Sequence, residues 1–449
     1  MTRIYIKDLS QHIDKEVSIK ARVEVRRDQG KLVFFDFADF GGIIQGVILP
    51  NQKTAHEIAK PIRQQWVVSV KGKINQRPEK NIQTDKQNGN IEMEIFEIEV
   101  LTPAAEMPFD LNADLNQDTL LDYRPLTIRR EREQKIFKVQ ETILNAFREF
   151  LNSQNFTEFQ APKIVGDDAE GGTEVFSFDY FYGKRASLAT SPQLYKQMMT
   201  GVYERVYTTG TQFRAEKHAT TRHLNEIYML DFEMGFINDH QDVIDMISNT
   251  LRHITQKVTE KHTDSLKFFG TTPSLAPDQF PQMKLREAQE LIKKETGKDC
   301  IGEPDLEPED ERWLCEYAAT NLASDFVVIT HYPVSKRPFY TMEDKADLGM
   351  TKSFDILFRG VEILSGSQRI HDHDALVANM KLKGLDPEKF RFYLTAFKYG
   401  LAPHGGIGMG LERLTEKFLN LDSIKEATLF PRDINRIDLL LSQSGESAQ

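Results

Sequence analysis

The stretch VYTTGTQFRAEKHATTRHLNEIYMLDFEMGF, residues 206–236, decides the fold of the larger part of the chain. Its two ends, 206–216 and 225–236, are rich in β-branched and aromatic residues, which is typical of strands. The polar segment KHATTRHL lies between them. The stretch therefore predicts a long hairpin with a polar loop at its tip.

Helices and further strands surround this hairpin in the sequence. Apolar residues recur at helical spacing over 134–154, strand patterns return at 353–366, and GIGMG (406–410) leads into another helix. An amphipathic helix begins at His240, and the mixed, proline-interrupted residues after it read as an insertion at about 240–345. The expected fold class is α+β, with a mostly antiparallel sheet flanked by helices over 134–449.

Residues 1–103 read as a separate β-rich domain. Five short segments rich in β-branched or aromatic residues are separated by glycines and by one helical spacer. This pattern favours a five-stranded barrel of the OB type, although another small barrel or a sandwich would look similar. Residues 104–133 are rich in Pro, Asp and Asn and lack periodicity, so we expect a hinge there.

The composition of the 449 residues, with 40% hydrophobic and 28% charged residues, is typical of a globular protein. The net charge of −11 argues against indiscriminate nucleic-acid binding but allows a local basic face. No apolar run approaches the roughly 20 residues of a membrane span, and residues 1–10 have no apolar stretch of the signal-peptide type, so neither a membrane span nor secretion is expected. With only Cys300 and Cys315, a disulfide scaffold is excluded and a cytoplasmic location is expected.

The expected hairpin loop is dense in charged and imidazole groups. FRAEKHATTRHLNE (213–226) holds Arg214, Glu216, Arg222 and His223 within one strand–loop–strand unit. An arginine held near the end of a strand could grip a phosphate or a carboxylate in bidentate fashion. The alternative is a surface hairpin with salt bridges, which would add little stability.

A glycine-rich stretch near the C-terminus, GIGMGLERLTEKFL (406–419), leads into a helix. Glycines such as Gly410 let a backbone approach a flat or anionic ligand closely, and Arg413 in the first helical turn could reach the same ligand. The spacing is G-x-G-x-G and no βαβ series surrounds it, so a dinucleotide-binding motif is rejected.

The stretch FRGVEILSGSQRIHDHD (358–374) offers metal and anion ligands. Glu362 and Ser365 supply the few protein oxygens that Mg²⁺ takes when water and phosphate complete its shell. Arg369 is a second candidate anion clamp. His371 and His373 could bind zinc, but no third ligand is evident. We therefore favour the interpretation that both histidines lie on the surface or in a loop.

Two neighbouring segments could close over and hold a small ligand. AEGGTEVF (169–176) is a flexible acidic loop that suits a lid. LATSPQLYKQ (188–197) places Ser191 as the cap of a helix starting at Pro192, with Gln193 and Lys196 on its first turns. A helix N-terminus favours anions, although Lys196 could equally be a solvated helix residue.

Taken together, these clusters resemble a known family. FTEFQAPKIV (156–165), FRAE…RHLNE and GIGMGLER, in that order, are similar to motifs 1, 2 and 3 of the class II aminoacyl-tRNA synthetases. EGGTE, SPQLYKQ, SGSQRIHD and FPRD narrow the resemblance to the aspartyl-tRNA synthetases of the shorter archaeal and eukaryotic type. The resemblance covers nearly the whole chain and is weakest at 240–345.

The resemblance implies an ATP-dependent ligase that forms aspartyl-adenylate and transfers aspartate to the terminal adenosine of tRNA(Asp). Its implied catalytic residues are Arg214 and Arg413, on the α- and γ-phosphates. The implied ATP-binding set is Arg214, Glu216, Arg222, His223, Glu362, Gly410 and Arg413. The implied Mg²⁺ ligands are Glu362 and Ser365. The implied aspartate-binding set is Glu170, Ser191, Gln193, Lys196, Asp231, Ser365 and Arg369.

The resemblance also implies partners and a tRNA range. Pro162 matches the motif 1 proline of a homodimer interface, while Asn155 replaces the usual motif 1 glycine. Residues expected to contact anticodon bases are Arg27, Phe34 and Gln45. A tryptophan typical of discriminating archaeal enzymes is missing where Arg22 and Glu24 stand, which leaves open the charging of tRNA(Asn) as well.

Three alternatives remain. Asparaginyl enzymes share these motifs but usually lack a lysine at position 196 and carry a glutamate at 231, so the sequence favours aspartate. An amide synthetase related to the catalytic domain would lack residues 1–103. A non-catalytic RNA-binding paralogue should have lost Arg214, Glu362 or Arg413, and all three are present.

Overall fold

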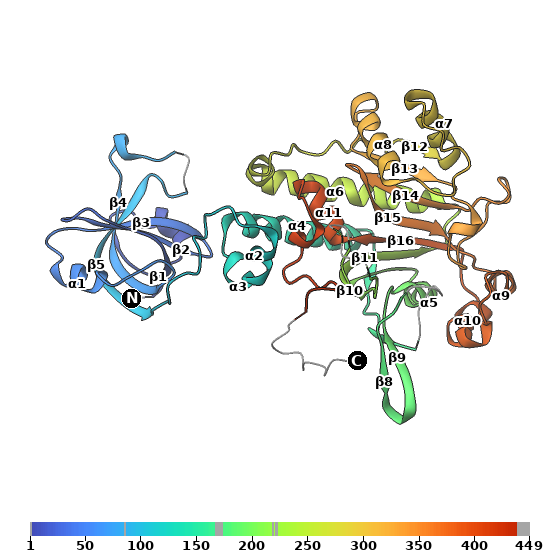
Figure 1. Cartoon of the computed structure of the whole chain (residues 1–449), viewed down its shortest axis with the longest axis horizontal. Helices are drawn as coiled ribbons and strands as arrows, with labels where there is room; N and C mark the ends of the chain where they lie inside the picture. Colours follow the sequence, from blue (N-terminus) through green and yellow to red (C-terminus); the bar gives the residue numbers. More distant parts are fainter. Residues whose placement is uncertain (1, 85–86, 167–173, 218–219, 221–222, 438–449) are drawn as a thin grey trace. The chain divides into compact units, whose positions relative to one another are not determined.

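The computed structural model describes residues 2–84, 87–166, 174–217, 220 and 223–437 (Figure 1). The chain divides into two compact units, Met1–Asp114 and Leu115–Gln449. Each has its own hydrophobic core.

The first unit is built on a closed five-stranded barrel with the order β1-β2-β3-β5-β4, which confirms the OB-type prediction. Residues alternate between the core and the outside, as in β2, where Phe35 and Phe37 are fully buried and Phe34 is half-buried. The strands and helices are η1 Ile6–His12, β1 Glu16–Asp28, β2 Val33–Asp39, β3 Gly42–Ile48, α1 Lys53–Ala59, β4 Val67–Gln76, η2 Glu79–Asn81 and β5 Ile91–Thr102.

The segment expected to be a hinge has local structure. Its second half forms α2 (Gln117–Asp122) and α3 (Arg124–Thr127). Asn116 caps α2 by accepting a hydrogen bond from the backbone N–H of Thr119. Arg124 is buried and donates to the carbonyls of Thr428 and Leu429, so this half of the segment is fastened to the second unit.

The second unit contains an eight-stranded sheet in the order β12-β13-β14-β15-β16-β11-β10-β6. Only the outer pairs β12–β13 and β10–β6 are parallel, so the expected mostly antiparallel sheet is confirmed. The predicted hairpin is present as β10 and β11. The strands are β6 Thr157–Glu158, β10 Arg205–Phe213, β11 Glu226–Gly235, β12 Gln282–Lys284, β13 Phe326–Thr330, β14 Ser353–Phe358, β15 Val361–Gln368 and β16 His404–Gly410.

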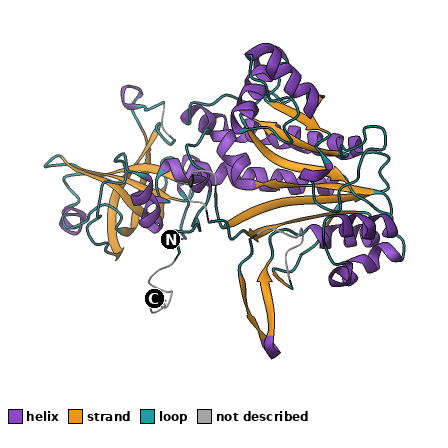
Figure 2. Cartoon of the chain, turned by 45° about the vertical axis from the view of Figure 1, so that its right-hand side comes forward, coloured by secondary structure: helices purple, strands orange, loops and turns teal. Residues whose placement is uncertain are grey.

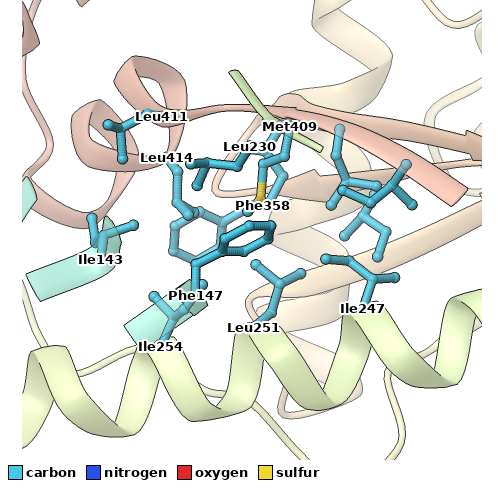
Figure 3. Close-up of a cluster of buried hydrophobic side chains, with 14 of the residues drawn as sticks. Ile143, Phe147, Leu230, Ile247, Leu251, Ile254, Phe358, Met409, Leu411 and Leu414 are labelled. Carbon is cyan, nitrogen blue, oxygen red and sulfur yellow. The ribbon is translucent and has the colours of Figure 1, made fainter. Parts of the chain in front are cut away.

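Three helices cover one face of this sheet and form the main core (Figure 3). They are α4 (Glu131–Ser153), α6 (His240–Phe268) and α11 (Leu411–Leu419). Phe147 of α4 and Leu251 of α6 point toward Phe358 and Met409 of the sheet, and all four side chains are fully buried. Close packing on this apolar face makes the sheet a rigid support for side chains on its other face.

Residues 240–345, where we expect an insertion, are packed with the rest of the second unit over much of their length. Helix α6 belongs to the main core, and β12 and β13 extend the central sheet. The stretch FVVIT of β13 is buried at every position, so it lacks the alternation that marks a half-exposed strand. Helices α7 (Leu285–Thr296) and α8 (Pro308–Asn321) pack with side chains of β13 and β14 in a smaller hydrophobic cluster.

A second, three-stranded sheet accompanies the central one, in the order β7-β9-β8. Figure 2 shows its hairpin as a two-stranded arm. The remaining elements of the unit are β7 Ile164–Val165, β8 Ser177–Tyr180, η3 Phe181–Gly183, β9 Lys184–Leu188, α5 Gln193–Tyr203, η4 Val334–Lys336, α9 His373–Leu382, η5 Pro387–Phe390, α10 Arg391–Lys398 and η6 Ile424–Ala427.

Asn155 adopts the left-handed conformation (φ 63°) just after α4, as expected for a residue that replaces glycine there. None of the described helices is long and apolar enough to cross a membrane.

Candidate active site

A cavity of about 510 Å³ in the second unit gathers most of the predicted site residues. They come from α5, β11, β15, β16 and the start of α11, and from the segments next to α5, β10, β11 and β15. The predicted residues that line it are Ser191, Gln193, Lys196, Arg214, Glu216, His223, Asp231, Glu362, Ser365, Arg369, Gly410 and Arg413. Glu170 and Arg222 lie outside the described residues.

Strand β16 explains why glycines are needed at this site. It lies between β11 and β15, with Gly408 paired to both Asp231 and Ser365. A Cβ atom on Gly406 would lie 2.1 Å from the backbone oxygen of Phe232 and 2.2 Å from a carboxylate oxygen of Glu233. Glycine at this position therefore makes room for both the neighbouring strand and a buried acid on it.

Lys196 is almost fully buried and is held from two sides. Its Nζ lies 2.9 Å from Asp231 Oδ1 and donates to the carbonyl of Ile407 at 2.7 Å. Burial raises the pKa of the Asp231 carboxyl, although Lys196 acts in the opposite direction. These contacts use two of the three N–H groups of the ammonium, which leaves one to serve a ligand in the cavity.

Arg369 is also buried, and Glu233 orients it. Arg369 Nε and Nη2 lie 2.8 and 3.2 Å from the two Glu233 oxygens, and Nη2 also donates to Gly406 O at 2.9 Å. Burial opposes ionisation of Glu233, but Arg369 and Lys196 outweigh it and lower the pKa of this carboxyl. With the bond from Nη1 to Ser367, four of five guanidinium N–H groups are used.

Sequence reasoning missed Glu233, a second buried acid that changes the charge balance of the site. Two carboxylates, Asp231 and Glu233, face Lys196 and Arg369, so these four groups carry no net charge when ionised. Recognition of an anion then depends on the spare, pre-oriented N–H donors rather than on an excess of positive charge. The available signal was the spacing of the two acids, since residues two apart on a strand share a face.

Gln193 is positioned by a chain of buried polar groups. Its amide nitrogen donates to Gln197 Oε1 at 3.0 Å, and Tyr393 donates its hydroxyl to the same oxygen at 3.0 Å. Gln197 Nε2 lies 2.9 Å from His404 Nε2, and burial lowers the pKa of His404 to about 4. His404 is therefore neutral at pH 7 and can accept this bond. Helix α5 begins at Gln193, whose N–H donates to Ser191 Oγ at 3.2 Å.

The candidate Mg²⁺ ligands lie beside a third oxygen ligand that sequence reasoning missed. Ser365 Oγ donates to Glu362 Oε1 at 2.7 Å, and Asp355 pairs with Ser365 across β14 and β15. Burial and the nearby Asp355 raise the pKa of Glu362, and Asp355 Oδ1 is buried without a hydrogen-bond partner among the described residues. A divalent cation would satisfy both acids, so this donor set fits Mg²⁺.

The predicted nucleotide side of the cavity is more open. The side chain of Arg214 is 42% exposed, and its Nη1 is 3.9 Å from Glu216 Oε1. Asn225 holds the ends of the loop by donating to the carbonyls of Arg214 and Glu216. Arg413 donates to the carbonyl of Glu362 at 3.0 Å, which directs it toward the candidate metal site. Arg214 thus has few protein contacts and can follow a ligand.

Glu412, next to Arg413, gives the site a titrating group. Both of its carboxylate oxygens accept from the backbone N–H of Tyr228, at 2.9 and 3.1 Å. Burial raises the pKa of this carboxyl to about 7 from the ordinary 4.5. The Glu412 carboxyl ionises more easily in the unfolded chain than in the folded one. Its contribution to stability is therefore fully present below pH 4.5 and is lost as the pH rises to 7. The expected loss is about 3 kcal/mol.

We expect Glu412→Gln to remove this pH dependence. We compare the difference in melting temperature, parent minus variant, at two pH values. This difference should be several degrees larger at pH 5 than at pH 8, because only the parent has a carboxyl that ionises at this position. Thermal unfolding of both proteins in matched buffers measures the difference. Melting temperatures that shift in parallel across this range would contradict the assigned titration.

The predicted anticodon residues lie together on the outside of the barrel. Arg27 pairs with Phe34 across β1 and β2, and Gln45 pairs with Asp36 across β2 and β3. Asp36 binds the Arg27 guanidinium in bidentate fashion at 2.9 Å, and Gln45 lies 3.5 Å from it. Phe34 is outside the barrel core, so its ring can stack on a base.

His371 precedes α9, and His373 lies in its first turn. His373 begins the helix, and Asp372 caps it by accepting from the N–H of Ala375. Within the described ranges, no group of three or more His, Cys, Asp or Glu residues could hold a metal ion. The candidate Mg²⁺ site differs because one of its ligands is a serine.

Comparison with known proteins agrees with both units. The family model described as class II tRNA synthetases (D, K and N) matches residues 116–434, and the OB-fold nucleic acid binding domain model matches 17–101. The chain is 41% identical to the aspartate–tRNA(Asp/Asn) ligase of Thermus thermophilus, covering 97% of this chain and 99% of the relative.

Two further relatives cover similar shares of the chain. The aspartate–tRNA(Asp) ligase of Pyrococcus abyssi is 38% identical, covering 96% of this chain and 98% of its own. Among solved structures, an asparaginyl-tRNA synthetase from Pyrococcus horikoshii with asparaginyl-adenylate is similar with a TM-score of 0.89 and 30% identity, covering 97% and 99% of the two chains.

Proposed function

Because this chain belongs to the class II tRNA synthetases of the D, K and N group, we propose that its cavity binds aspartate and ATP. The protein is a ligase that joins aspartate to tRNA. One observation carries the amino-acid assignment: Lys196 and Arg369 line one cavity, and each keeps one N–H beyond those used by protein acceptors.

Amino-acid binding follows from those two donors. The side-chain carboxylate of aspartate accepts hydrogen bonds from Lys196 and Arg369, while Asp231 and Glu233 hold the two cations in place. The amide of asparagine would offer one oxygen where the carboxylate offers two, and its NH₂ group would face donors. Such a mismatch in a buried polar site is costly, so the site selects aspartate.

Adenylate formation needs positioning and charge neutralisation rather than a protein nucleophile. The α-carboxylate of aspartate attacks the α-phosphorus of ATP, and pyrophosphate leaves. Arg214 neutralises the α-phosphate and the attacking carboxylate, while Glu216 and His223 bind the adenine and the distal phosphates. Arg413 holds the γ-phosphate. The aspartyl group then passes to the terminal ribose of tRNA.

Mg²⁺ belongs to this proposal as a bound cofactor. Glu362, Ser365 and Asp355 would hold it, with Asp355 Oδ1 as the acceptor that lacks a protein partner. When bound, the ion would neutralise phosphate charge and orient the triphosphate. Arg337 Nη2 lies 2.7 Å from Asp355 Oδ2 and donates a hydrogen bond to it, so only Oδ1 is left without a partner among the described residues.

The proposed tRNA range includes tRNA(Asn). The relative from Thermus thermophilus is named for both tRNAs, and Arg22 and Glu24 stand where a discriminating tryptophan is expected. Those two side chains bind each other at 3.1 Å, and Glu24 also accepts from Gln65. This part of the barrel therefore presents a paired, polar surface rather than an indole ring.

The substrate range is tested with two amino acids and two purified tRNAs. ATP–pyrophosphate exchange should depend on aspartate, with asparagine at least 100-fold weaker. Aspartate should then be attached to tRNA(Asp) and to tRNA(Asn) with kcat/KM values within about tenfold of each other, since binding energies that differ by no more than about 1.4 kcal/mol correspond to that range. Exchange driven by asparagine alone would refute the aspartate assignment, and charging of tRNA(Asp) alone would refute the broader tRNA range.

The remaining parts of the proposal concern assembly and location. We propose a homodimer, because Pro162 follows α4 at the position that matches the motif 1 proline of the family's dimer interface. We also propose that the protein acts in the cytoplasm, where tRNA is charged. Cys300 and Cys315 are both buried and free, which suits a reducing compartment.

A further inference from the structure

A second aromatic and cationic surface lies on the barrel at the turn between β2 and β3. Phe40 is 74% exposed, and Tyr5 packs edge-on against it with ring centroids 4.8 Å apart. The Arg3 guanidinium lies 4.7 Å from the Tyr5 ring centre, and Lys7 Nζ lies 5.3 Å from that of Phe40. We call these four residues the Phe40 surface.

The Phe40 surface is firmly built. The Asp39 side chain is 3% exposed and joins the N-terminal segment to the turn. Its oxygens accept from the backbone N–H groups of Ile6 at 3.1 Å and Gly41 at 2.7 Å, and Arg3 lies 3.6 Å away. Asn88 also donates to the carbonyls of Ile6 and Ile43. The rings are thus presented on a fixed frame although folding does not bury Phe40.

The Phe40 surface continues the outer face that carries the candidate anticodon residues. Alternation along β2 places Phe34 and Asp36 outside and Phe35 and Phe37 in the core, so the face runs along the strand to its end beside Phe40. Six residues of strand span about 20 Å. OB folds bind about 4–16 nucleotides of single strand, which is more than the residues around Phe34 can contact by themselves.

We propose that the Phe40 surface is a second RNA contact, where an unpaired base stacks on Phe40 and Arg3 and Lys7 meet the adjoining phosphates. Two cations beside two rings match the charge and the π-faces of a single RNA strand, and the chain as a whole is acidic, with a net charge of −11. The RNA is the unpaired stretch continuous with the anticodon bases. The inference rests on the proposed function, since it assumes the same tRNA partner.

The test measures binding of tRNA(Asp) and of its isolated anticodon stem–loop to the full chain. Phe40→Ala should weaken both by about tenfold, whereas Phe40→Trp should bind as the parent does because it keeps a stacking face. Lys7→Gln should lower the slope of log affinity against log salt by about 0.7. Phe392→Ala is the matched control, because Phe392 is 76% exposed in the second unit.

Aspartate-dependent ATP–pyrophosphate exchange separates this proposal from the proposed function, since it requires no tRNA. Exchange should be unchanged in Phe40→Ala. If exchange is intact but Phe40→Ala and Phe392→Ala bind RNA equally, the second contact is refuted and the ligase assignment stands. A loss seen with whole tRNA but not with the stem–loop, or a changed oligomeric state in Phe40→Ala, would also overturn the proposal.

Discussion

Replacing Arg214 by alanine is expected to lower kcat of aspartate-dependent ATP–pyrophosphate exchange by about 10²–10³-fold. Arg214 follows directly after β10 and lines the cavity, where the α-phosphate and the attacking carboxylate must meet. Two anions approach each other there, so removal of the cation raises the barrier more than it weakens substrate binding. Steady-state exchange kinetics with varied ATP and aspartate measure the effect.

This substitution should leave the fold intact, because Arg214 is 42% exposed and its closest acid is 3.9 Å away. A melting temperature within about two degrees of the parent would show this, since surface substitutions change stability by less than about 0.5 kcal/mol. Arg185→Ala, at an exposed arginine on β9, is the matched control. A raised KM for ATP with unchanged kcat would contradict a role in the transition state.

The parts of the site that could be predicted from sequence are those set by local spacing. Arg214 near the end of a strand and Arg413 at a helix start are recognisable because a few neighbouring residues define their setting. Glu362 and Ser365 are close enough in sequence to suggest a shared ligand, and the structure joins them by a hydrogen bond. The barrel was predictable for the same reason, because its strands alternate over short distances.

The parts that could not be predicted depend on pairing across the sheet. Asp355 stands in SFDILF, a strand buried at every position, where an acid gives no sign of its partner. Its neighbour Ser365 becomes known only from the register of β14 and β15. Glu233 reaches Arg369 across 136 residues of sequence. The place of β13 in the sheet is hidden for a similar reason, because this strand is buried at every position and shows no alternation.

The pairing of Arg369 with Glu233 determines how amino-acid selection can be tested. Arg369→Met alone leaves the buried Glu233 carboxylate without its hydrogen-bonded cation and with only Lys196, 3.7 Å away, which should destabilise the second unit by about 3–5 kcal/mol. Loss of activity in that variant would therefore say little about aspartate. Arg369→Met combined with Glu233→Gln removes both charges, and such replacements of a buried pair are often close to neutral for stability.

We expect the double variant to fold but to lose about 10²–10³-fold in kcat/KM for aspartate, since truncating one partner of a buried charged pair costs about 2–5 kcal/mol. KM for ATP should stay within about threefold, because Arg214 and Arg413 are untouched. Arg359→Met with Asp325→Asn is the matched control: that pair, 2.9 Å apart, does not line the cavity. If the double variant is as stable as the parent and still uses aspartate normally, Lys196 alone provides recognition. The spare N–H group of Arg369 would then have no part in it.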